Sequence, residues 1–174
     1  KSVLNQTYSN FELCLVDDAS ERERVREIIK EYAHSDQRIK FLFRKDNGHI
    51  SQASNSALSL VTGEFVAILD HDDFLWPNAL FEVVRKIEEN PEANFIYSDE
   101  DKIDEKGKIH SDPFFKPDFS PNYLRSVNYI THFTVIRASL VEKVGGFRRG
   151  FEGAQDWDLF LRVVTELEER KELK

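Results

Sequence analysis

Short apolar runs alternate with amphipathic segments through roughly the first hundred residues, and this alternation limits the fold more than any other feature of the chain. Runs rich in β-branched and aromatic residues predict strands, which we place at 11–18, 38–44, 64–70 and 93–102. Apolar residues at helical spacing predict helices between them, at 21–34, 51–61 and 78–90. This alternation predicts an α/β fold, with a parallel sheet and helices on both of its faces.

The second half of the chain has a less regular pattern. Residues 103–130 carry prolines among aromatic and charged residues and predict a loop over one end of the sheet. A strand, a helix and a Gly-Gly stop are predicted in 131–147, and a final helix in 156–174. The predicted buried face of the final helix is Leu159, Phe160 and Val163. No second core is apparent, so we expect a single domain.

Two acidic clusters stand where predicted strands end. Asp17 and Asp18 follow the first strand, and Asp70, Asp72 and Asp73 follow the third. Ligands of parallel α/β sheets bind at the carboxyl ends of the strands, so we expect both clusters on one rim. Carboxylates are hard oxygen ligands that suit Mg²⁺ or Mn²⁺ bridging phosphate oxygens. The alternative is a solvated loop whose acids favour the N-terminus of the next helix.

Two further stretches carry candidate ligand-binding residues. Asn47-Gly48 predicts a turn at the same rim, where glycine would allow close contact between the backbone and a ligand. The glycine-rich, partly basic stretch 145–155 leads into Asp156, which is a candidate general base or a helix N-cap. The histidines show no metal-binding spacing, and among them His71 and His132 are candidates to line the rim.

Charge and cysteine content disfavour several classes of protein. The formal net charge is −8, which disfavours a nucleic-acid backbone as the main partner and fits a bound cation. A single cysteine, Cys14, excludes a disulfide framework and is compatible with a reducing cytoplasm. No apolar run approaches the roughly 20 residues of a membrane span, and no segment resembles a signal peptide.

Two known families place acid pairs at strand ends, and the first is the receiver domain of two-component signalling. The chain offers a similar arrangement in Asp17-Asp18, Asp70 and Lys116-Pro117. Asp70 is followed by HDDFLWP rather than by the receiver's Met-Pro turn, however, and the chain continues well past the length of a receiver. A phosphoacceptor receiver is therefore the weaker alternative.

The second family fits nearly the whole chain, which resembles family 2 glycosyltransferases of the GT-A fold. The segment SVLNQTYSNFELCLVDDAS (2–20) resembles the family's Q-T-Y and D-D-x-S block. The segment KDNGHISQASNSALSLVTGEFVAILDHDD (45–73) resembles its N-x-G to L-D-x-D-D block, and GGFRRGFEGAQDWDL (145–159) its G-G-F to D-x-D-L block. Three motifs in the family's order make the resemblance specific.

The resemblance implies an α/β, Rossmann-like GT-A fold for nucleotide-diphospho-sugar transfer, with a mostly parallel sheet flanked by helices. The family begins with an apolar strand and a P-x-Y-N-like turn that do not precede the Q-T-Y segment here. We therefore expect a sheet that lacks its N-terminal strand near the centre. We also expect one catalytic domain over 1–174 that is truncated at its N-terminus and at its C-terminus.

The resemblance also implies a function, the inverting transfer of a sugar from a nucleotide-diphosphate donor to an acceptor hydroxyl in cell-surface polysaccharide biosynthesis. Mn²⁺ or Mg²⁺ would be held by Asp72 and Asp73, and Asp156 would be the catalytic base that deprotonates the acceptor. The residues implied in donor or nucleotide binding are Asp17, Asp18, Asn47, Gly48, Asn55, Asp70 and Asp72.

The partners that the resemblance implies are a nucleotide-diphospho-sugar donor and a saccharide or lipid-linked acceptor, with no nucleic acid. The implied compartment is the cytoplasm, at the inner face of the membrane if regions outside this sequence associate with it peripherally. A chain that binds nucleotide and metal without transferring a sugar is the alternative function that the residues leave open.

Overall fold

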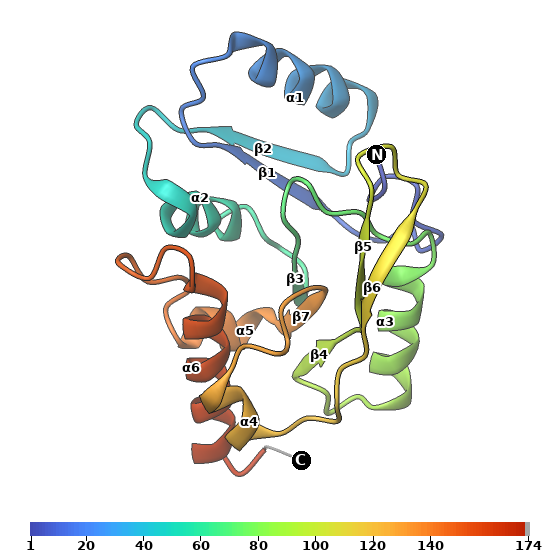
Figure 1. Ribbon diagram of the computed structural model, residues 1–174. Helices are drawn as coiled ribbons and strands as arrows, with labels where there is room; N and C mark the ends of the chain where they lie inside the picture. Colours follow the sequence, from blue (N-terminus) through green and yellow to red (C-terminus); the bar gives the residue numbers. More distant parts are fainter. Residues whose placement is uncertain (173–174) are drawn as a thin grey trace.

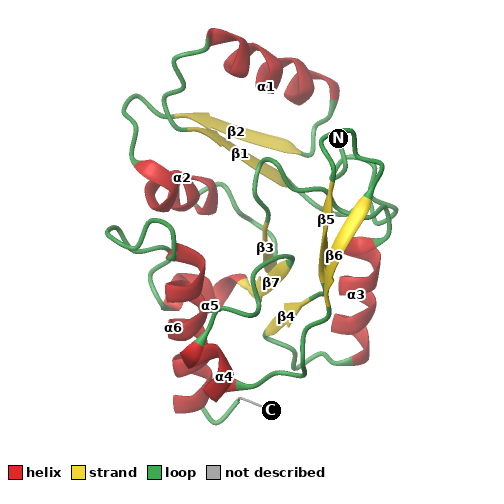
Figure 2. Ribbon diagram, viewed as in Figure 1, coloured by secondary structure: helices red, strands yellow, loops and turns green. Residues whose placement is uncertain are grey.

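The computed structural model describes residues 1–172 and has the alternating strands and helices that the sequence predicts (Figure 1 and Figure 2). The strands are β1 (Leu13–Asp17), β2 (Ile39–Phe43), β3 (Phe65–Ile68), β4 (Phe95–Tyr97), β5 (Glu100–Ile103), β6 (His110–Phe114) and β7 (Thr134–Arg137). The helices are α1 (Glu23–Ser35), α2 (His49–Leu58), α3 (Ala79–Glu89), α4 (Pro121–Ser126), α5 (Ala138–Lys143) and α6 (Gln155–Glu169). Leu173 and Lys174, the last two residues of the predicted final helix, lie outside the described residues.

The first layer is the parallel pair β1–β2, whose register sets Asp17 opposite Phe43. Helices α1 and α2 lie on opposite sides of this pair (Figure 1). Helix α1 begins at Glu23, after Arg22, and not directly after the Asp17-Asp18 turn. The reason is local, because the Ser20 amide donates to the Asp17 carboxylate at 3.2 Å and extends the turn.

The second layer is the three-stranded sheet β3–β7–β4, whose two strand pairs are both antiparallel, where a mostly parallel sheet was predicted. β7 lies between β3 and β4 and is antiparallel to both, with Thr134 opposite Ile68 on one side and Tyr97 on the other. Helix α3 connects β3 to β4 as a crossover, which makes these two strands parallel to each other. The strand that returns between them needs no crossover helix when it runs antiparallel.

The main core lies between this sheet and helices α4, α5 and α6. Ile136 of β7 and Leu124 of α4 are fully buried in it. The predicted buried face of α6 is confirmed, because Leu159, Phe160 and Val163 are fully buried as well. Burial of one such side chain contributes about 1.5–3 kcal/mol, so this core is the main source of stability in the second half of the chain.

The stretches predicted as one strand (93–102) and one loop (103–130) are organised differently. The predicted strand is divided into β4 and β5, which belong to different sheets, and β5 pairs with β6 in an antiparallel hairpin. Every residue of β6 is exposed, so no alternation of apolar and polar residues marks it in the sequence. The predicted loop also contains α4, whose N-cap Ser120 accepts a hydrogen bond from the Tyr123 amide.

Strand pairing does not join the two layers within residues 1–172. There β1 pairs only with β2, and β3 pairs only with β7, so each of these strands keeps one free edge.

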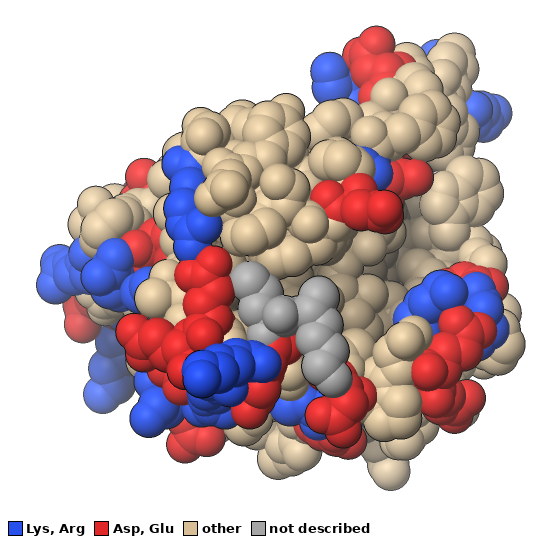
Figure 3. Space-filling view, turned by 90° about the horizontal axis from the view of Figure 1, so that it is seen from below, with Lys and Arg blue, Asp and Glu red and all other residues tan. Residues whose placement is uncertain are grey.

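The surface around the C-terminal end of α6 carries interspersed acidic and basic side chains (Figure 3). Arg125 of α4 pairs with Glu168 at 2.6 Å, and Arg170 pairs with Glu166 at 2.7 Å. Pairs near the surface contribute little to stability, because solvent screens them. In the part of the chain that the structure describes, no helix has both the length and the apolar character needed to cross a membrane.

The carboxylate of Glu12 ties the start of β1 to the chain beyond α2. It accepts hydrogen bonds from the Thr62 and Gly63 amides, at 2.5 and 3.0 Å, and it pairs with Lys40. Burial alone would raise the pKa of Glu12, but these partners outweigh it and lower the pKa from 4.5 to about 2. The stabilisation is therefore fully present above pH 4.5 and is lost as the pH falls through about 2.

Replacing Glu12 by Gln is expected to lower the free energy of unfolding by about 2 kcal/mol at neutral pH, because the backbone amides lose a charged acceptor. The difference should shrink as the pH falls toward about 2, where the wild-type carboxyl is itself protonated. Urea unfolding of both proteins across this pH range measures the difference. A gap that stays constant with pH would contradict the role of the charged carboxylate.

Candidate functional site

The antiparallel pairing of β3 with β7 brings two distant stretches of the chain together. Ile68, at the end of β3, lies opposite Thr134, at the start of β7. The residues that follow β3 therefore run beside the residues that precede β7. In this way the acidic stretch 70–73 comes to lie against His132.

Asp70, Asp73 and His132 form a group of side chains that can hold a metal ion. One ligand atom from each lies within 4.8 Å of the others. The Asp70 carboxylate is 3.6 Å from Nε2 of the His132 ring. The Asp73 carboxylate is 3.8 Å from Nδ1 of the same ring. All three side chains are half-buried, so the group is open to a ligand from one side.

The group carries negative charge that its protein surroundings do not neutralise. Burial raises the pKa of Asp73, and the nearby carboxylates of Asp70 and Asp72 raise it further. The attraction of His132 opposes this rise. Nδ1 of His132 is buried and has no hydrogen-bond partner among the described residues. Each nitrogen of the His132 ring faces one carboxylate, Nε2 that of Asp70 and Nδ1 that of Asp73. Two carboxylates beside an imidazole fit a divalent cation, since carboxylates suit Mg²⁺ and Mn²⁺ and imidazole suits transition metals.

Asp72 lies outside this group, although the motif suggests it as a metal ligand beside Asp73. Its side chain is 78% exposed, and its carboxylate lies 3.9 Å from Nδ1 of the His71 ring. His71 is exposed as well. The loop after β3 therefore turns Asp73 inward and leaves Asp72 at the surface.

Asp17 and Asp18, at the end of β1, are engaged by the protein itself. The buried Asp17 carboxylate accepts from Arg26 Nε at 2.9 Å. Burial would raise the pKa of Asp17, but the hydrogen bonds from Ser20 and Arg26 outweigh it and lower the pKa. The Asp18 carboxylate pairs with Arg44 at 2.7 Å. Both carboxylates thus shape the rim of the β1–β2 layer.

Asn47 and Gly48 pack against Asp18 at that rim. The Gly48 amide donates to the Asp18 carboxylate at 3.0 Å, and Nδ2 of Asn47 donates to the Asp18 carbonyl at 3.1 Å. A Cβ atom on Gly48 would lie 2.4 Å from Arg44 Nη2 and 2.7 Å from Gln52 Cβ. Close packing against these two side chains therefore requires glycine at this position, whether or not a ligand approaches.

Asn55 joins α2 to the Gly-Gly-Phe turn after α5. Its Nδ2 donates to the Phe147 carbonyl at 2.8 Å, and its Oδ1 accepts from the Phe147 amide at 2.9 Å. A Cβ atom on Gly146 would lie 2.5 Å from Oδ1 of Asn55, and Gly146 also has a positive φ of 66°. The amide of Asn55 is thus occupied by the backbone of a loop that is close to Asp156 in sequence.

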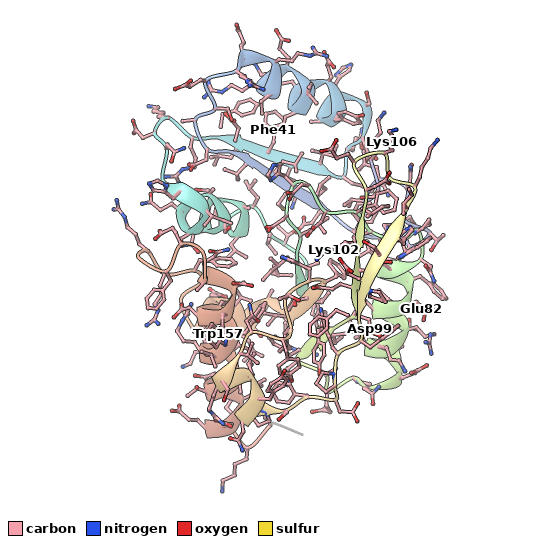
Figure 4. The ribbon with its side chains drawn as sticks, in the orientation of Figure 1. Phe41, Glu82, Asp99, Lys102, Lys106 and Trp157 are labelled. Atoms are coloured by element: carbon pink, nitrogen blue, oxygen red, sulfur yellow. The ribbon has the colours of Figure 1, made fainter. Side chains whose placement is uncertain are left out.

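Asp156 lies in the first turn of α6 and is half-buried. Its Oδ2 accepts a hydrogen bond from Nδ2 of Asn128 at 2.8 Å. The neighbouring Trp157 is fixed by a hydrogen bond from its indole nitrogen to the Leu124 carbonyl at 2.7 Å, and Figure 4 shows it on α6 facing α4. Asp156 is therefore held at one carboxylate oxygen by a neutral donor.

Asn128 and Glu100 lie far from the acidic motifs in sequence and were not predicted as site residues, and Lys116 was considered only in the receiver-like arrangement. Asn128 contacts Asp156, and Glu100 and Lys116 contact the backbone of His132. Burial would raise the pKa of Glu100, but hydrogen bonds from Thr131 and Lys116 outweigh it and lower the pKa. The predicted strand 93–102 contains three consecutive acids, Asp99, Glu100 and Asp101, and no local signal singles out Glu100 among them.

Comparison with known proteins gives one family and several relatives. The family described as Glycosyl transferase family 2 matches residues 1–145.

An uncharacterized protein of Sinorhizobium fredii, y4gI, is 48% identical over 98% of this chain and 19% of its own length. The O-antigen biosynthesis protein RfbC of Myxococcus xanthus is 43% identical over 93% of this chain and 13% of its own length. Chondroitin synthase of Escherichia coli is 31% identical over 94% of this chain and 24% of its own length. The chain thus spans a quarter or less of these curated relatives.

Solved structures share the fold at low sequence identity. TarS 1–349 of S. aureus superposes with a TM-score of 0.72 and 20% identity, over 93% of this chain and 49% of the other. The mannosyltransferase PcManGT of Pyrobaculum calidifontis, solved with GDP-Man and Mn²⁺, has a TM-score of 0.66 and 21% identity over 93% and 46%. TarS has also been solved with UDP and with UDP-GlcNAc.

Proposed function

The chain belongs to glycosyl transferase family 2 and has the GT-A fold, and from this premise we propose that it transfers a sugar from a nucleotide-diphosphate donor to an acceptor hydroxyl with inversion. The observation that carries the proposal is the convergence of Asp70, Asp73 and His132 at the junction of β3 and β7. A cation held there would face the charged diphosphate of such a donor. The proposed process is cell-surface polysaccharide biosynthesis, in keeping with the names of RfbC and chondroitin synthase.

The proposed donor is a nucleotide-diphospho-sugar, and the acceptor is a saccharide or a lipid-linked saccharide. The related structures carry UDP, UDP-GlcNAc or GDP-Man, which supports the donor class and leaves its base and sugar unassigned. Asp17, Asp18, Asn47 and Gly48 form the proposed nucleotide side of the site. The proposed compartment is the cytoplasm, which suits the single free thiol of Cys14.

The proposed cofactor is Mn²⁺, with Mg²⁺ as the weaker choice, because the group includes an imidazole as well as carboxylates. We assign the ion to Asp73, Asp70 and His132, and the exposed Asp72 to the outer edge of the site, toward the donor. When bound, a divalent ion stabilises the negative charge that develops on the departing diphosphate. The residues themselves supply the charge and the geometry that select the ion.

Asp156 is the proposed general base. A carboxylate takes the proton of the acceptor hydroxyl as the new bond forms, so it must be ionised, oriented and open to the acceptor. Asn128 orients Asp156 through Oδ2, and no hydrogen bond to Oδ1 occurs within residues 1–172. Asn55 is proposed to act by holding the loop that precedes α6, since its side-chain amide bonds the Phe147 backbone.

Replacing Asp73 by Asn, or His132 by Ala, is expected to weaken Mn²⁺ binding at least about tenfold, because each change removes one ligand. Thermal shift with Mn²⁺ and a panel of UDP- and GDP-sugars measures the binding of ion and donor. Asp112→Asn is the control, since Asp112 is an exposed acid of the hairpin that pairs with Lys102. Equal responses of wild type and Asp73→Asn would count against the proposed ion site.

Two other outcomes would point to the alternative functions. Binding of Mn²⁺ and nucleotide without transfer to any acceptor, in the full-length protein, would favour a chain that only binds its ligands. Labelling of Asp70 by acetyl phosphate would favour a receiver, and we expect none.

A further inference from the structure

The backbone of His132 is held from both sides by one ion pair. Its N–H donates to Oε2 of Glu100 at 3.1 Å, and its carbonyl accepts from Nζ of Lys116. Oε2 of Glu100 also accepts from Lys116, at 3.1 Å, so the two side chains that hold His132 are bonded to each other. His132 is therefore fixed although it lies before the first residue of β7.

The same pair holds the residues that precede His132. Oγ1 of Thr131 donates to Glu100 at 2.7 Å, and Nζ of Lys116 donates to the Ile130 carbonyl at 2.5 Å. The ammonium group thus meets two carbonyls and one carboxylate, which matches its three protons. The Lys116 side chain is only 1% exposed, so solvent does not compete for these bonds. A lysine with all of its donors engaged is suited to hold structure rather than to react.

The Glu100–Lys116 pair lies at the base of the β5–β6 hairpin. Glu100 opens β5 opposite Phe114 of β6, and Lys116 follows soon after β6. The Lys116 amide donates to the Asp99 carboxylate at 2.8 Å, which closes the base of the hairpin. Figure 4 shows Asp99 at this base and Lys106 at the far tip. The base of the hairpin, and not its exposed tip, therefore meets the loop that carries His132.

We propose that Glu100 and Lys116 are positioning residues that aim the His132 imidazole at the divalent ion of the site. This inference rests on the proposed function. Within residues 1–172 neither side chain forms a hydrogen bond or ion pair with Asp70 or Asp73, so both act through the His132 backbone. Groups that orient a ligand raise metal affinity, because the ligand has less freedom to lose when the ion binds.

The test uses Mn²⁺ alone as the probe and needs no turnover. The Mn²⁺ affinity is measured from the electron paramagnetic resonance signal of the free ion, for wild type, Glu100→Gln, His132→Ala and the double variant. Glu100→Gln keeps the shape of the side chain and is expected to weaken Mn²⁺ binding about tenfold. In the His132→Ala background the same change should cost nothing further, because the ligand that Glu100 positions is gone.

The outcomes separate this inference from the proposed function. An equal loss on Glu100→Gln in both backgrounds would show that Glu100 acts on the fold in general, and would overturn the positioning role. A loss in His132→Ala without any loss in Glu100→Gln would overturn it as well and keep the ion site. Unchanged affinity in His132→Ala would instead refute the ion site itself.

A matched control comes from Glu12 near the start of β1, whose carboxylate, like that of Glu100, accepts from backbone N–H, from a threonine hydroxyl and from a lysine. Glu12→Gln should lower stability and leave Mn²⁺ affinity unchanged. If Glu100→Gln does not fold, the variant Glu100→Gln/Lys116→Met carries the same expectation, because it leaves no unpaired buried charge. Normal Mn²⁺ affinity in that folded variant would overturn the inference.

Discussion

Replacing Asp156 by Asn is expected to lower the rate of sugar transfer about 100- to 10,000-fold, the usual contribution of a general base. The amide of Asn cannot accept the proton of the acceptor hydroxyl, whereas its oxygen can still accept the hydrogen bond from Asn128. The fold and the position of the side chain should therefore be kept. Turnover at saturating donor, acceptor and Mn²⁺ is the measurement, in the full-length protein.

Binding measurements decide what a loss of rate in Asp156→Asn means. The affinities for Mn²⁺ and for the donor should equal those of the wild type, because Asp156 belongs to neither proposed binding group. Glu152→Gln is the matched control, since Glu152 is an exposed acid of the loop just before α6 that accepts a hydrogen bond from the Gly150 amide. Full turnover of Asp156→Asn would remove Asp156 from the role of base.

Replacing Asp158 by Asn, two residues along the same helix, is expected to lower the free energy of unfolding by about 3 kcal/mol, because the change leaves the largely buried Arg162 guanidinium without its charged partner. The Asp158 side chain is 6% exposed and pairs with Arg148 and Arg162. Burial would raise the pKa of Asp158, but hydrogen bonds from the two arginines outweigh it and lower the pKa. Arg148 is half-exposed, so most of the loss should come from Arg162.

The Asp158–Arg162 pair stabilises the fold because Arg162 also bonds another segment of the chain. Its guanidinium also donates to the Val144 and Gly146 carbonyls, at 2.6 and 2.7 Å, and so ties α6 to the turn after α5. Urea unfolding measures the loss, with Glu27→Gln as control because the Arg24–Glu27 pair lies exposed on α1. The control should change stability little, since solvent screens that pair. Wild-type stability in Asp158→Asn would contradict the structural role of Asp158.

The sequence alone does not predict the different roles of the two aspartates in the Asp-Trp-Asp stretch, Asp156 and Asp158. Spacing alone leaves Asp156 as a candidate general base or a helix N-cap, and it assigns no role to Asp158. Burial separates them, since Asp158 turns toward two arginines and Asp156 toward a neutral amide. The functional assignment of Asp156 therefore stays a prediction that the structure makes testable.

The sequence also predicts the proposed metal ligands only in part. The motif suggests Asp72 and Asp73 as ligands of the ion, and it does not identify a third ligand. The structure groups Asp73 with Asp70 and with His132, which belongs to another part of the chain. His132 has no metal-binding neighbour in sequence, so its place beside the acids follows from the pairing of β3 with β7.

The sequence by itself determined the elements whose patterns are local. Apolar periodicity located the first strands and the helices α1, α2 and α3, and it identified the buried face of α6. Tertiary structure alone decided which distant segments meet: the antiparallel entry of β7 between β3 and β4, the exposed β5–β6 hairpin, and the ion pair that holds His132. The physical reason is that the buried face of a helix or strand is visible in the spacing of apolar residues within that same short segment. A contact between distant segments depends instead on how the whole chain closes around its core.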